Sequence, residues 1–140
     1  MNAPTWQPPI RPVRVRILVV DENERLLHAL LQLLATEPAV DVVGSAHTLE
    51  EALVQAVALA PQLVLVDWNL PQSAVAESCR VMRLHPVLPK IVALLDDDDD
   101  SYRESAIATG ADAAVGKGRL SEALYPRLEE LFPVVQPPRR

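Results

Sequence analysis

The chain has 140 residues, with 49% hydrophobic and 23% charged side chains, so it is long enough and apolar enough for one packed domain and is not wholly disordered. Its formal net charge of −6 excludes a chain built mainly to coat nucleic acid, which needs clustered Lys and Arg. Cys79 is the single cysteine, which excludes an intrachain disulfide and a cysteine-rich zinc site and fits a reducing cytoplasm.

Prolines and apolar runs mark the limits of the folded part. Seven of the 13 prolines lie within residues 1–12 and 133–140, and proline-rich segments with little apolar surface favour extended chain. We expect one domain over 13–132, a flexible tail at 1–12, and a tail or truncated linker at 133–140. No apolar run is long enough to cross a bilayer, and the N-terminus lacks a secretory signal pattern. We therefore expect a cytoplasmic protein without membrane contact.

Five short apolar segments have the length and composition of buried strands. They are rich in Val, Ile, Leu and Ala, and the first ends in the uninterrupted run ILVV. In chain order these segments are 13–20, 40–46, 63–66, 90–95 and 113–116.

A segment with helical spacing of apolar residues follows each strand. Thr48 and Glu51 predict a capping box at the start of the second helix, and Gly110 predicts the end of the fourth. Pro126 removes a backbone donor inside the fifth, which predicts a kinked or late-starting helix. In chain order these helices are 23–35, 49–60, 74–84, 101–109 and 120–131.

Alternating strands and helices predict right-handed βαβ units. The expected fold is α/β: a doubly wound, five-stranded parallel sheet between two layers of helices. In such sheets the functional groups collect beyond the carboxyl ends of the strands. We therefore expect Asp21, Glu22 and Asp67, which follow the first and third strands, to meet Lys117, which follows the fifth.

This constellation predicts a phosphoryl-transfer site with a metal ion. Three converging carboxylates would repel one another, and a divalent cation with oxygen ligands, most commonly Mg²⁺, relieves that repulsion. Mg²⁺ typically takes one or two carboxylates, so one acid stays free to attack a phosphoryl donor, while Lys117 neutralises charge on the transferred oxygens. Asp67 is the expected nucleophile.

Three blocks of sequence resemble the receiver domain of two-component response regulators, the CheY-like family with a flavodoxin-like fold. They are VRILVVDEN, LVLVDWNLP and GADAAVGKG. The resemblance covers nearly all of 13–132, and VVGSAHTLEEAL is most similar to the LuxR/NarL-type subgroup of transcription factors.

The resemblance implies a role for each residue that matches the family pattern. Asp67 falls on the phosphoacceptor, Asp21 and Glu22 on the acidic pair that holds Mg²⁺, and Lys117 on the family's lysine. Asn69 falls where a backbone carbonyl binds the metal. The implied partner is a sensor histidine kinase or a phosphotransfer protein. DNA would be reached only through an output domain outside this chain, and a homodimer is left open.

Two switch positions depart from the family pattern. Where the family usually has Thr or Ser at the end of the fourth strand, counting back from Lys117 gives Leu95 and counting on from Pro89 gives Leu94. The aromatic position of the fifth strand is Ala114. The usual coupling of a hydroxyl to an aromatic side chain is therefore not expected here.

Several residues have two interpretations from the sequence alone. The acids at 96–100 are either a solvated helix start or charges that disfavour phosphorylation of Asp67. Asp21 and Glu22 could also cap the first helix, and Trp68 either contacts a partner or covers aliphatic surface. Cys79 is expected in the core, while His28, His47 and His85 have no ligand spacing.

Three functions compete at this stage. The first is a phosphorylated receiver that switches a protein interface, and the second is a pseudo-receiver that binds partners without phosphorylation, which Leu95 and Ala114 favour. The third, a phosphatase, usually needs a second Asp two residues after the nucleophile, where this chain has Asn69. We therefore expect a protein that is not an enzyme.

Overall fold

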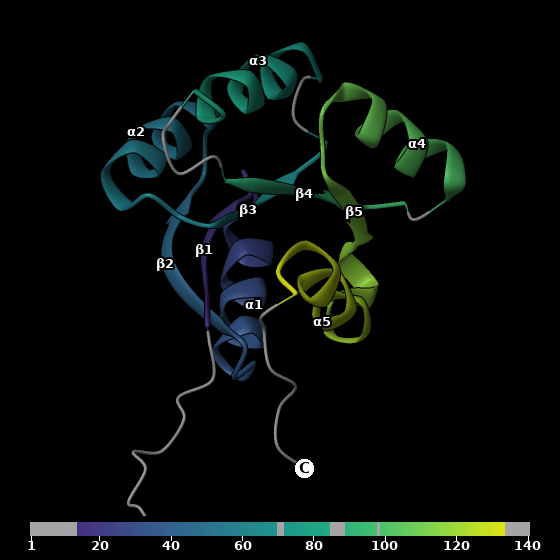
Figure 1. Ribbon diagram of the computed structural model, residues 1–140. Helices are drawn as coiled ribbons and strands as arrows, with labels where there is room; N and C mark the ends of the chain where they lie inside the picture. The colour runs from purple at the N-terminus through teal and green to yellow at the C-terminus, as the bar shows by residue number, and fades with distance from the viewer. Residues whose placement is uncertain (1–13, 70–71, 85–88, 98, 134–140) are drawn as a thin grey trace, which may run out of the picture.

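The computed structural model describes residues 14–69, 72–84, 89–97 and 99–133. Nearly all of the two predicted proline-rich tails, and His85, lie outside these residues. Figure 1 shows a central sheet with helices on both sides.

Five parallel strands form the sheet in the order β2-β1-β3-β4-β5. The prediction of a doubly wound parallel sheet is confirmed. The strand order reverses between β1 and β3, so a crevice opens at their carboxyl ends, which is where such folds place their sites. The strands are β1 (Val15–Val20), β2 (Val40–Ala46), β3 (Leu63–Asp67), β4 (Lys90–Leu95) and β5 (Ala113–Gly116).

Each strand is followed by a helix, as the spacing of apolar residues predicts. Helix α3 begins two residues earlier than predicted, at Gln72, and a short 3-10 turn at Lys117–Arg119 precedes the last helix. That helix runs through Pro126 without ending there. The helices are α1 (Glu24–Ala35), α2 (Leu49–Leu59), α3 (Gln72–Met82), α4 (Asp100–Thr109) and α5 (Leu120–Leu131).

The helix starts confirm one predicted cap and correct another. Thr48 Oγ1 accepts a hydrogen bond from Glu51 N at 3.1 Å, while the Glu51 carboxylate accepts one from His47 N. Helix α1 is capped by Asn23, whose Oδ1 accepts from Leu26 N at 3.1 Å. Asp21 and Glu22 therefore do not cap this helix, because the chain turns once more before the helix begins.

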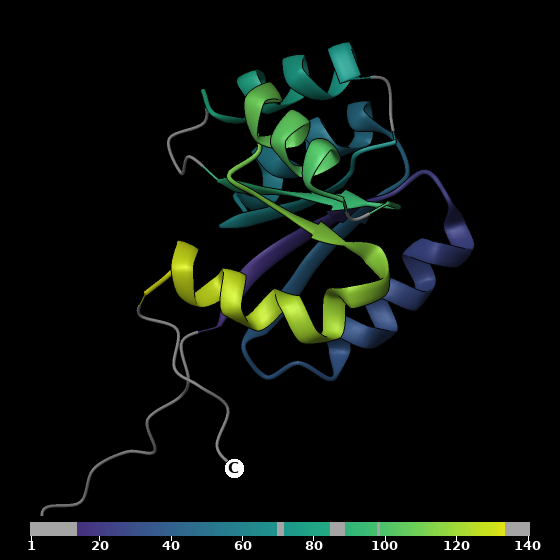
Figure 2. The ribbon, with the colours of Figure 1, turned by 90° about the vertical axis from the view of Figure 1, so that its right-hand side faces the viewer.

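Helices lie on both sides of the sheet (Figure 2), and a separate layer of core side chains packs on each side. One, which we call the α1–α5 face, contains leucines from α1 and α5 against Ile17, Leu65, Leu94 and other strand residues. The other, the α2–α4 face, contains small residues from α2 and α4 together with Trp68, Cys79 and Met82. Successive strand residues alternate between these faces, so each residue that ends a strand is committed to one of them.

Candidate functional site

Two buried carboxylates stand at the crevice between β1 and β3. Asp21 follows β1 and Asp67 ends β3, with relative exposures of 0% and 3%. Each accepts a hydrogen bond from the backbone N–H two residues later: Asn23 N to Asp21 Oδ1 at 2.9 Å, and Asn69 N to Asp67 Oδ1 at 3.0 Å. These tight Asx-type turns fix both acids at the sheet edge.

Lys117 brings its ammonium to both carboxylates. Its Nζ lies 2.9 Å from Asp67 Oδ1 and 3.3 Å from Asp21 Oδ2, and its side chain is only 9% exposed. The sequence predicts that these three residues meet, and the structure brings them together. They come from the ends of β1, β3 and β5.

The charges at this edge shift two pKa values. Burial raises the pKa of Asp21 above its ordinary value, and the nearby Asp67 charge adds to this, although Asn23 N–H and Lys117 oppose it. Burial lowers the pKa of Lys117, but hydrogen bonds to Asp96 and Asp67 and the charge of Asp21 outweigh it, so the net shift is upward. Lys117 therefore stays protonated at neutral pH.

The residues present fit a magnesium ion with two carboxylates rather than three. Asp21 Oδ2 is a buried oxygen that makes no hydrogen bond among the described residues. Together with Asp67 it supplies the one or two carboxylates that Mg²⁺ usually takes. The backbone carbonyl of Asn69, two residues after Asp67, stays the predicted third ligand. Within the described part of the chain, no three His, Cys, Asp or Glu side chains gather in a group able to hold a metal.

Glu22 differs from the two buried acids in its exposure. Its side chain is exposed and lines a surface cavity with His47, Thr48 and Ser78, between the start of α2 and α3. That Glu22 joins Asp21 and Asp67 at a metal ion stays a prediction.

The end of β4 decides between the two leucines at the switch position. Leu94 packs in the α1–α5 face, whereas Leu95 packs in the α2–α4 face with Ala114. Leu95 and Ala114 thus share one side of the sheet, on neighbouring strands. The count from Lys117, which gives Leu95, agrees with this geometry, and neither position carries a hydroxyl or an aromatic ring.

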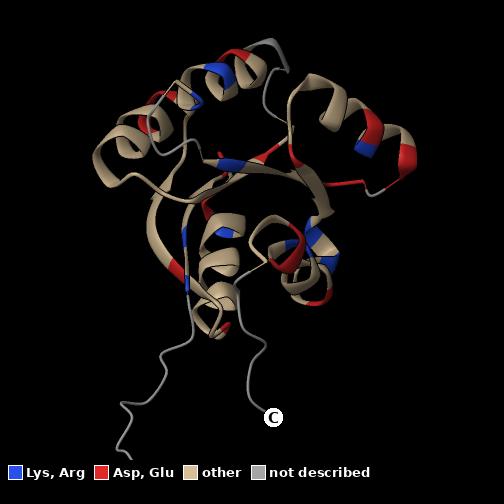
Figure 3. Cartoon of the chain, in the orientation of Figure 1, with Lys and Arg blue, Asp and Glu red and all other residues tan. Residues whose placement is uncertain are grey.

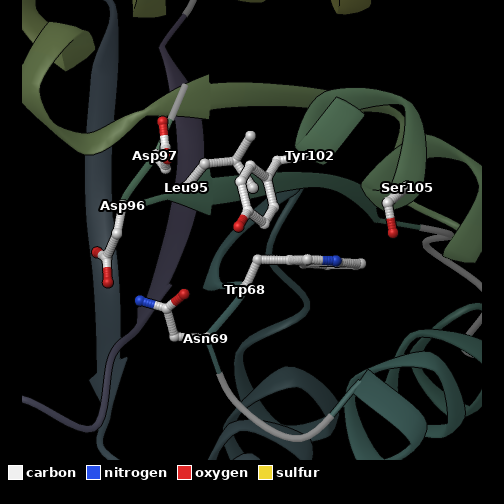
Figure 4. Close-up of a pocket in the computed structure, with 7 residues that line it drawn as sticks. All are labelled: Trp68, Asn69, Leu95, Asp96, Asp97, Tyr102 and Ser105. Carbon is white, nitrogen blue, oxygen red and sulfur yellow. The ribbon is translucent and has the colours of Figure 1, made fainter. Parts of the chain in front are cut away.

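Trp68 occupies the space beside these two positions. It is 6% exposed and packs in the α2–α4 face, and its Nε1 has no hydrogen-bond partner among the described residues. It also lines a cavity of about 410 Å³ with Leu95, Asp97 and Tyr102, among others. In Figure 4 the indole ring extends beneath Tyr102 across this cavity. Of the two interpretations left open by the sequence, Trp68 therefore covers aliphatic core.

The acids at 96, 97, 99 and 100 divide into separate structural roles, and Asp98 lies outside the described residues. Asp99 caps α4, accepting from Tyr102 N at 3.0 Å, and Asp100 lies in its first turn. Asp97 lines the cavity, while Asp96 Oδ1 lies 2.9 Å from Lys117 Nζ. Figure 3 shows this acidic stretch leading from β4 into α4. The Asp96 contact was missed from the sequence, and only the pairing of β4 with β5 could have indicated it.

The remaining ionisable candidates are structural or peripheral. Cys79 is buried as predicted, and burial raises the pKa of its thiol to about 11. His28 is exposed, and His47 Nε2 lies 3.8 Å from Glu24. Within the described residues, no helix combines the length and apolar character needed to cross a bilayer.

Comparisons with known proteins agree with this geometry. The family model for the response regulator receiver domain matches residues 17–129. Response regulator GacA of Pseudomonas protegens is 32% identical over 105 residues, which are 74% of this chain and 49% of GacA. The chain thus spans about half the length of that relative.

Two solved structures have the same fold at lower sequence identity. A LuxR-family two-component response regulator from Aurantimonas sp. has a TM-score of 0.72 and 23% identity, with 84% of each chain covered. The second is the crystal structure of the P1 domain of CheA3 in complex with CheY6 from R. sphaeroides. The matching chain has a TM-score of 0.72 and 23% identity, and the match covers 81% of this chain and 96% of that chain.

Proposed function

The chain belongs to the response regulator receiver domain family of two-component systems, and on that premise we propose that Asp67 accepts a phosphoryl group with the help of Mg²⁺. The observation that carries the proposal is the buried contact of Lys117 Nζ with Asp67 Oδ1 at 2.9 Å, beside Asp21. An ammonium held there would neutralise charge that develops on the transferred phosphoryl oxygens.

The transfer uses one oxygen of Asp67 as the nucleophile. That oxygen attacks the phosphorus of a phosphohistidine, so that an O–P bond forms as the N–P bond breaks, and the imidazole keeps the electron pair and takes up a proton. Asn69 N–H and Lys117 both bind Oδ1 of Asp67. They leave Oδ2 as the oxygen free to react.

Asp21, Asp67 and the Asn69 carbonyl would hold the metal. When bound, Mg²⁺ supplies positive charge to the phosphoryl oxygens and helps align the donor. The role of Asp21 is to present Oδ2 without a competing hydrogen bond. Glu22 is proposed to contribute from the solvent side, directly or through water, because its side chain is exposed.

The proposed partner is a sensor histidine kinase or a phosphotransfer protein in the cytoplasm. The solved complex of CheY6 with the P1 domain of CheA3 supports this class of partner. The output is proposed to be a changed protein interface, either with a partner or with a second copy of the chain. Control of transcription would follow only if a DNA-binding output domain accompanies the receiver.

A pseudo-receiver that binds a partner without phosphorylation is the second candidate. Leu95 and Ala114 favour it, because neither has the hydroxyl or aromatic ring through which phosphorylation usually changes the conformation of this family. Either way, we propose that the domain is not an enzyme, and absence of turnover of a small phosphate ester such as p-nitrophenyl phosphate would support that.

Intact-mass measurement after incubation with acetyl phosphate tests the main proposal. We expect a gain of one phosphoryl group, dependent on Mg²⁺ and absent in Asp67→Asn. Asp41→Asn is the matched control, because Asp41 is an exposed acid on β2 away from the site. A protein that gains no mass with any phosphodonor, including a phosphorylated histidine kinase, would leave the pseudo-receiver as the function.

A further inference from the structure

Asp96 directly follows the switch position, and its carboxylate reaches the amine of the phosphorylation site. Asp96 Oδ1 and Asp67 Oδ1 both lie 2.9 Å from Lys117 Nζ. We propose that Asp96 is a built-in anion that competes with a phosphoryl group on Asp67 for Lys117. In the unphosphorylated protein it holds the turn after β4 against the site, and the phosphoryl group displaces it. This inference rests on the proposed function and adds a positioning residue to it.

Three carboxylates already share the charge of Lys117. Asp67, Asp96 and Asp21 lie 2.9, 2.9 and 3.3 Å from its Nζ, and an ammonium carries only three N–H groups. A phosphoryl oxygen that approaches Lys117 therefore competes with these carboxylates for its charge. The competition should displace the carboxylate that is held least firmly.

Burial identifies Asp96 as the group that leaves. The side chains of Asp21 and Asp67 are 0% and 4% exposed, and backbone N–H groups hold both. The side chain of Asp96 is 56% exposed, so water can solvate its carboxylate once the contact with Lys117 breaks. Separating either buried acid from Lys117 would instead leave a buried carboxylate with only its backbone N–H partner and little access to solvent.

The position of Asp96 connects this exchange to the end of β4. In Figure 4 the Leu95 side chain lies toward Tyr102 over the cavity, whereas the Asp96 side chain points away from Trp68 and Tyr102. Release of Asp96 would free the turn that carries Asp97, which lines the same cavity. The cavity lies beside Trp68, so Trp68 should sense the change.

This arrangement would move the turn after β4 away from the phosphorylation site, whereas a hydroxyl at the switch position would draw it toward the site. A Thr or Ser at position 95 would be drawn toward a phosphoryl group by a hydrogen bond. A carboxylate at position 96 is expelled by the same phosphoryl group, because both are anions and both need Lys117. The absence of a hydroxyl at Leu95 therefore does not leave the turn uncoupled.

Binding of beryllofluoride, a phosphoryl analogue, tests the competition. We would titrate it with Mg²⁺ into proteins carrying Trp6→Phe, which leaves Trp68 as the only tryptophan, and follow Trp68 fluorescence. Asp96→Asn should bind about fivefold more tightly than the parent, as expected for loss of a competing contact. Asp97→Asn removes the same charge one residue away and should stay within about twofold, since an exposed charge without contact is largely screened.

Equal tightening in the two variants would overturn the proposal, because long-range charge alone would then explain it. Weaker binding by Asp96→Asn would also overturn it. Asp96→Glu, which restores a carboxylate, should return the affinity toward that of the parent. A structural role of Asp96 alone would not give this pattern.

A second measurement without any phosphoryl analogue separates this inference from the proposed function. Amide hydrogen exchange at Asp96 and Asp97 should be faster in Asp96→Asn than in the parent or in Asp97→Asn, because the turn loses its hold on Lys117. If none of the proteins binds beryllofluoride, the proposed function and the competition both fail. Faster exchange in Asp96→Asn would still support the conclusion that the contact of Asp96 with Lys117 restrains the turn. Unchanged exchange would overturn that conclusion.

Discussion

The two faces of the sheet are packed by different kinds of side chain. The α1–α5 face is filled by branched aliphatic residues, with Leu30 and Leu34 of α1 and Leu124 and Leu128 of α5 against the strands. The α2–α4 face mixes seven buried alanines with ten larger buried residues, Trp68 among them, and the 410 Å³ cavity adjoins it. Large interlocking side chains resist displacement, whereas small side chains beside a cavity can accommodate a shift.

This difference places the capacity to move next to the candidate site. Leu95 and Ala114, the two switch positions, both belong to the α2–α4 face. The strands that carry Asp21 and Asp67 pack in both faces, with Val19 and Leu65 in the α1–α5 face and Val20 and Val66 in the α2–α4 face. We therefore expect the first face to set stability and the second to carry conformational change.

The strongest test of the comparison removes a leucine from the α1–α5 face. Leu128 is fully buried, so Leu128→Ala should lower the free energy of unfolding by about 3–4 kcal/mol through lost burial and a residual cavity. Chemical denaturation followed by circular dichroism would measure it. Leu84→Ala is the matched control, because Leu84 is 72% exposed and its loss should change stability by less than about 0.5 kcal/mol. Equal effects would contradict the assignment of stability to this face.

A pH titration of stability reports on the α2–α4 face. Burial raises the pKa of Cys79 from 9.0 to about 11, so the unfolded thiol ionises first as pH rises. The stability that the neutral thiol provides is therefore present below pH 9 and lost between 9 and 11, a loss of about 2 kcal/mol. Denaturation of wild type and Cys79→Ala across this range should converge as pH rises. Parallel curves would contradict the prediction.

Replacing Asp21, a buried acid at the sheet edge, should weaken metal binding and increase stability. The pKa of Asp21 is raised above 3.8, chiefly by burial. The unfolded carboxyl therefore ionises at a lower pH than the folded one, and the free energy of unfolding falls as pH rises from 3.8 to the folded pKa. Above the folded pKa this loss of stability is complete. Asp21→Asn should therefore be more stable than the wild type at pH 7. The same variant should lose the stabilisation that Mg²⁺ gives the wild type in thermal denaturation, a result that Asp41→Asn should not share.

A smaller effect is expected where β2 packs under α2. A Cβ atom at Gly44 would lie 2.4 Å from Gln55 Oε1 and 2.8 Å from Leu59 Cδ1, both at the far ends of flexible side chains. Gly44→Ala should cost about 1 kcal/mol, because these ends can move only at the expense of the Gln55 hydrogen bond to Ser45 O. In a Gln55→Ala background the same substitution should cost less. A larger cost there would show that this face is as tightly packed as the other.

The agreement between sequence and structure is closest where a local pattern carries the information. The apolar runs, the leucine spacing and the Thr48 and Gly110 signals depend on neighbours in the chain, and each element forms within about two residues of its predicted range. The convergence of Asp21, Asp67 and Lys117 also followed from sequence, because parallel strands end at a common edge.

What only the tertiary structure decided is the direction in which side chains point once the strands end. Glu22 lines an exposed cavity beside α2, Leu95 rather than Leu94 shares one face of the sheet with Ala114, and Asp96 reaches Lys117. Strand pairing brings residues 96 and 117 within contact although 21 positions separate them, and no local pattern records that pairing. The sequence by itself thus determined the fold and the identity of the charged groups, while packing decided which of them share one ammonium, because contacts between distant segments depend on the whole sheet.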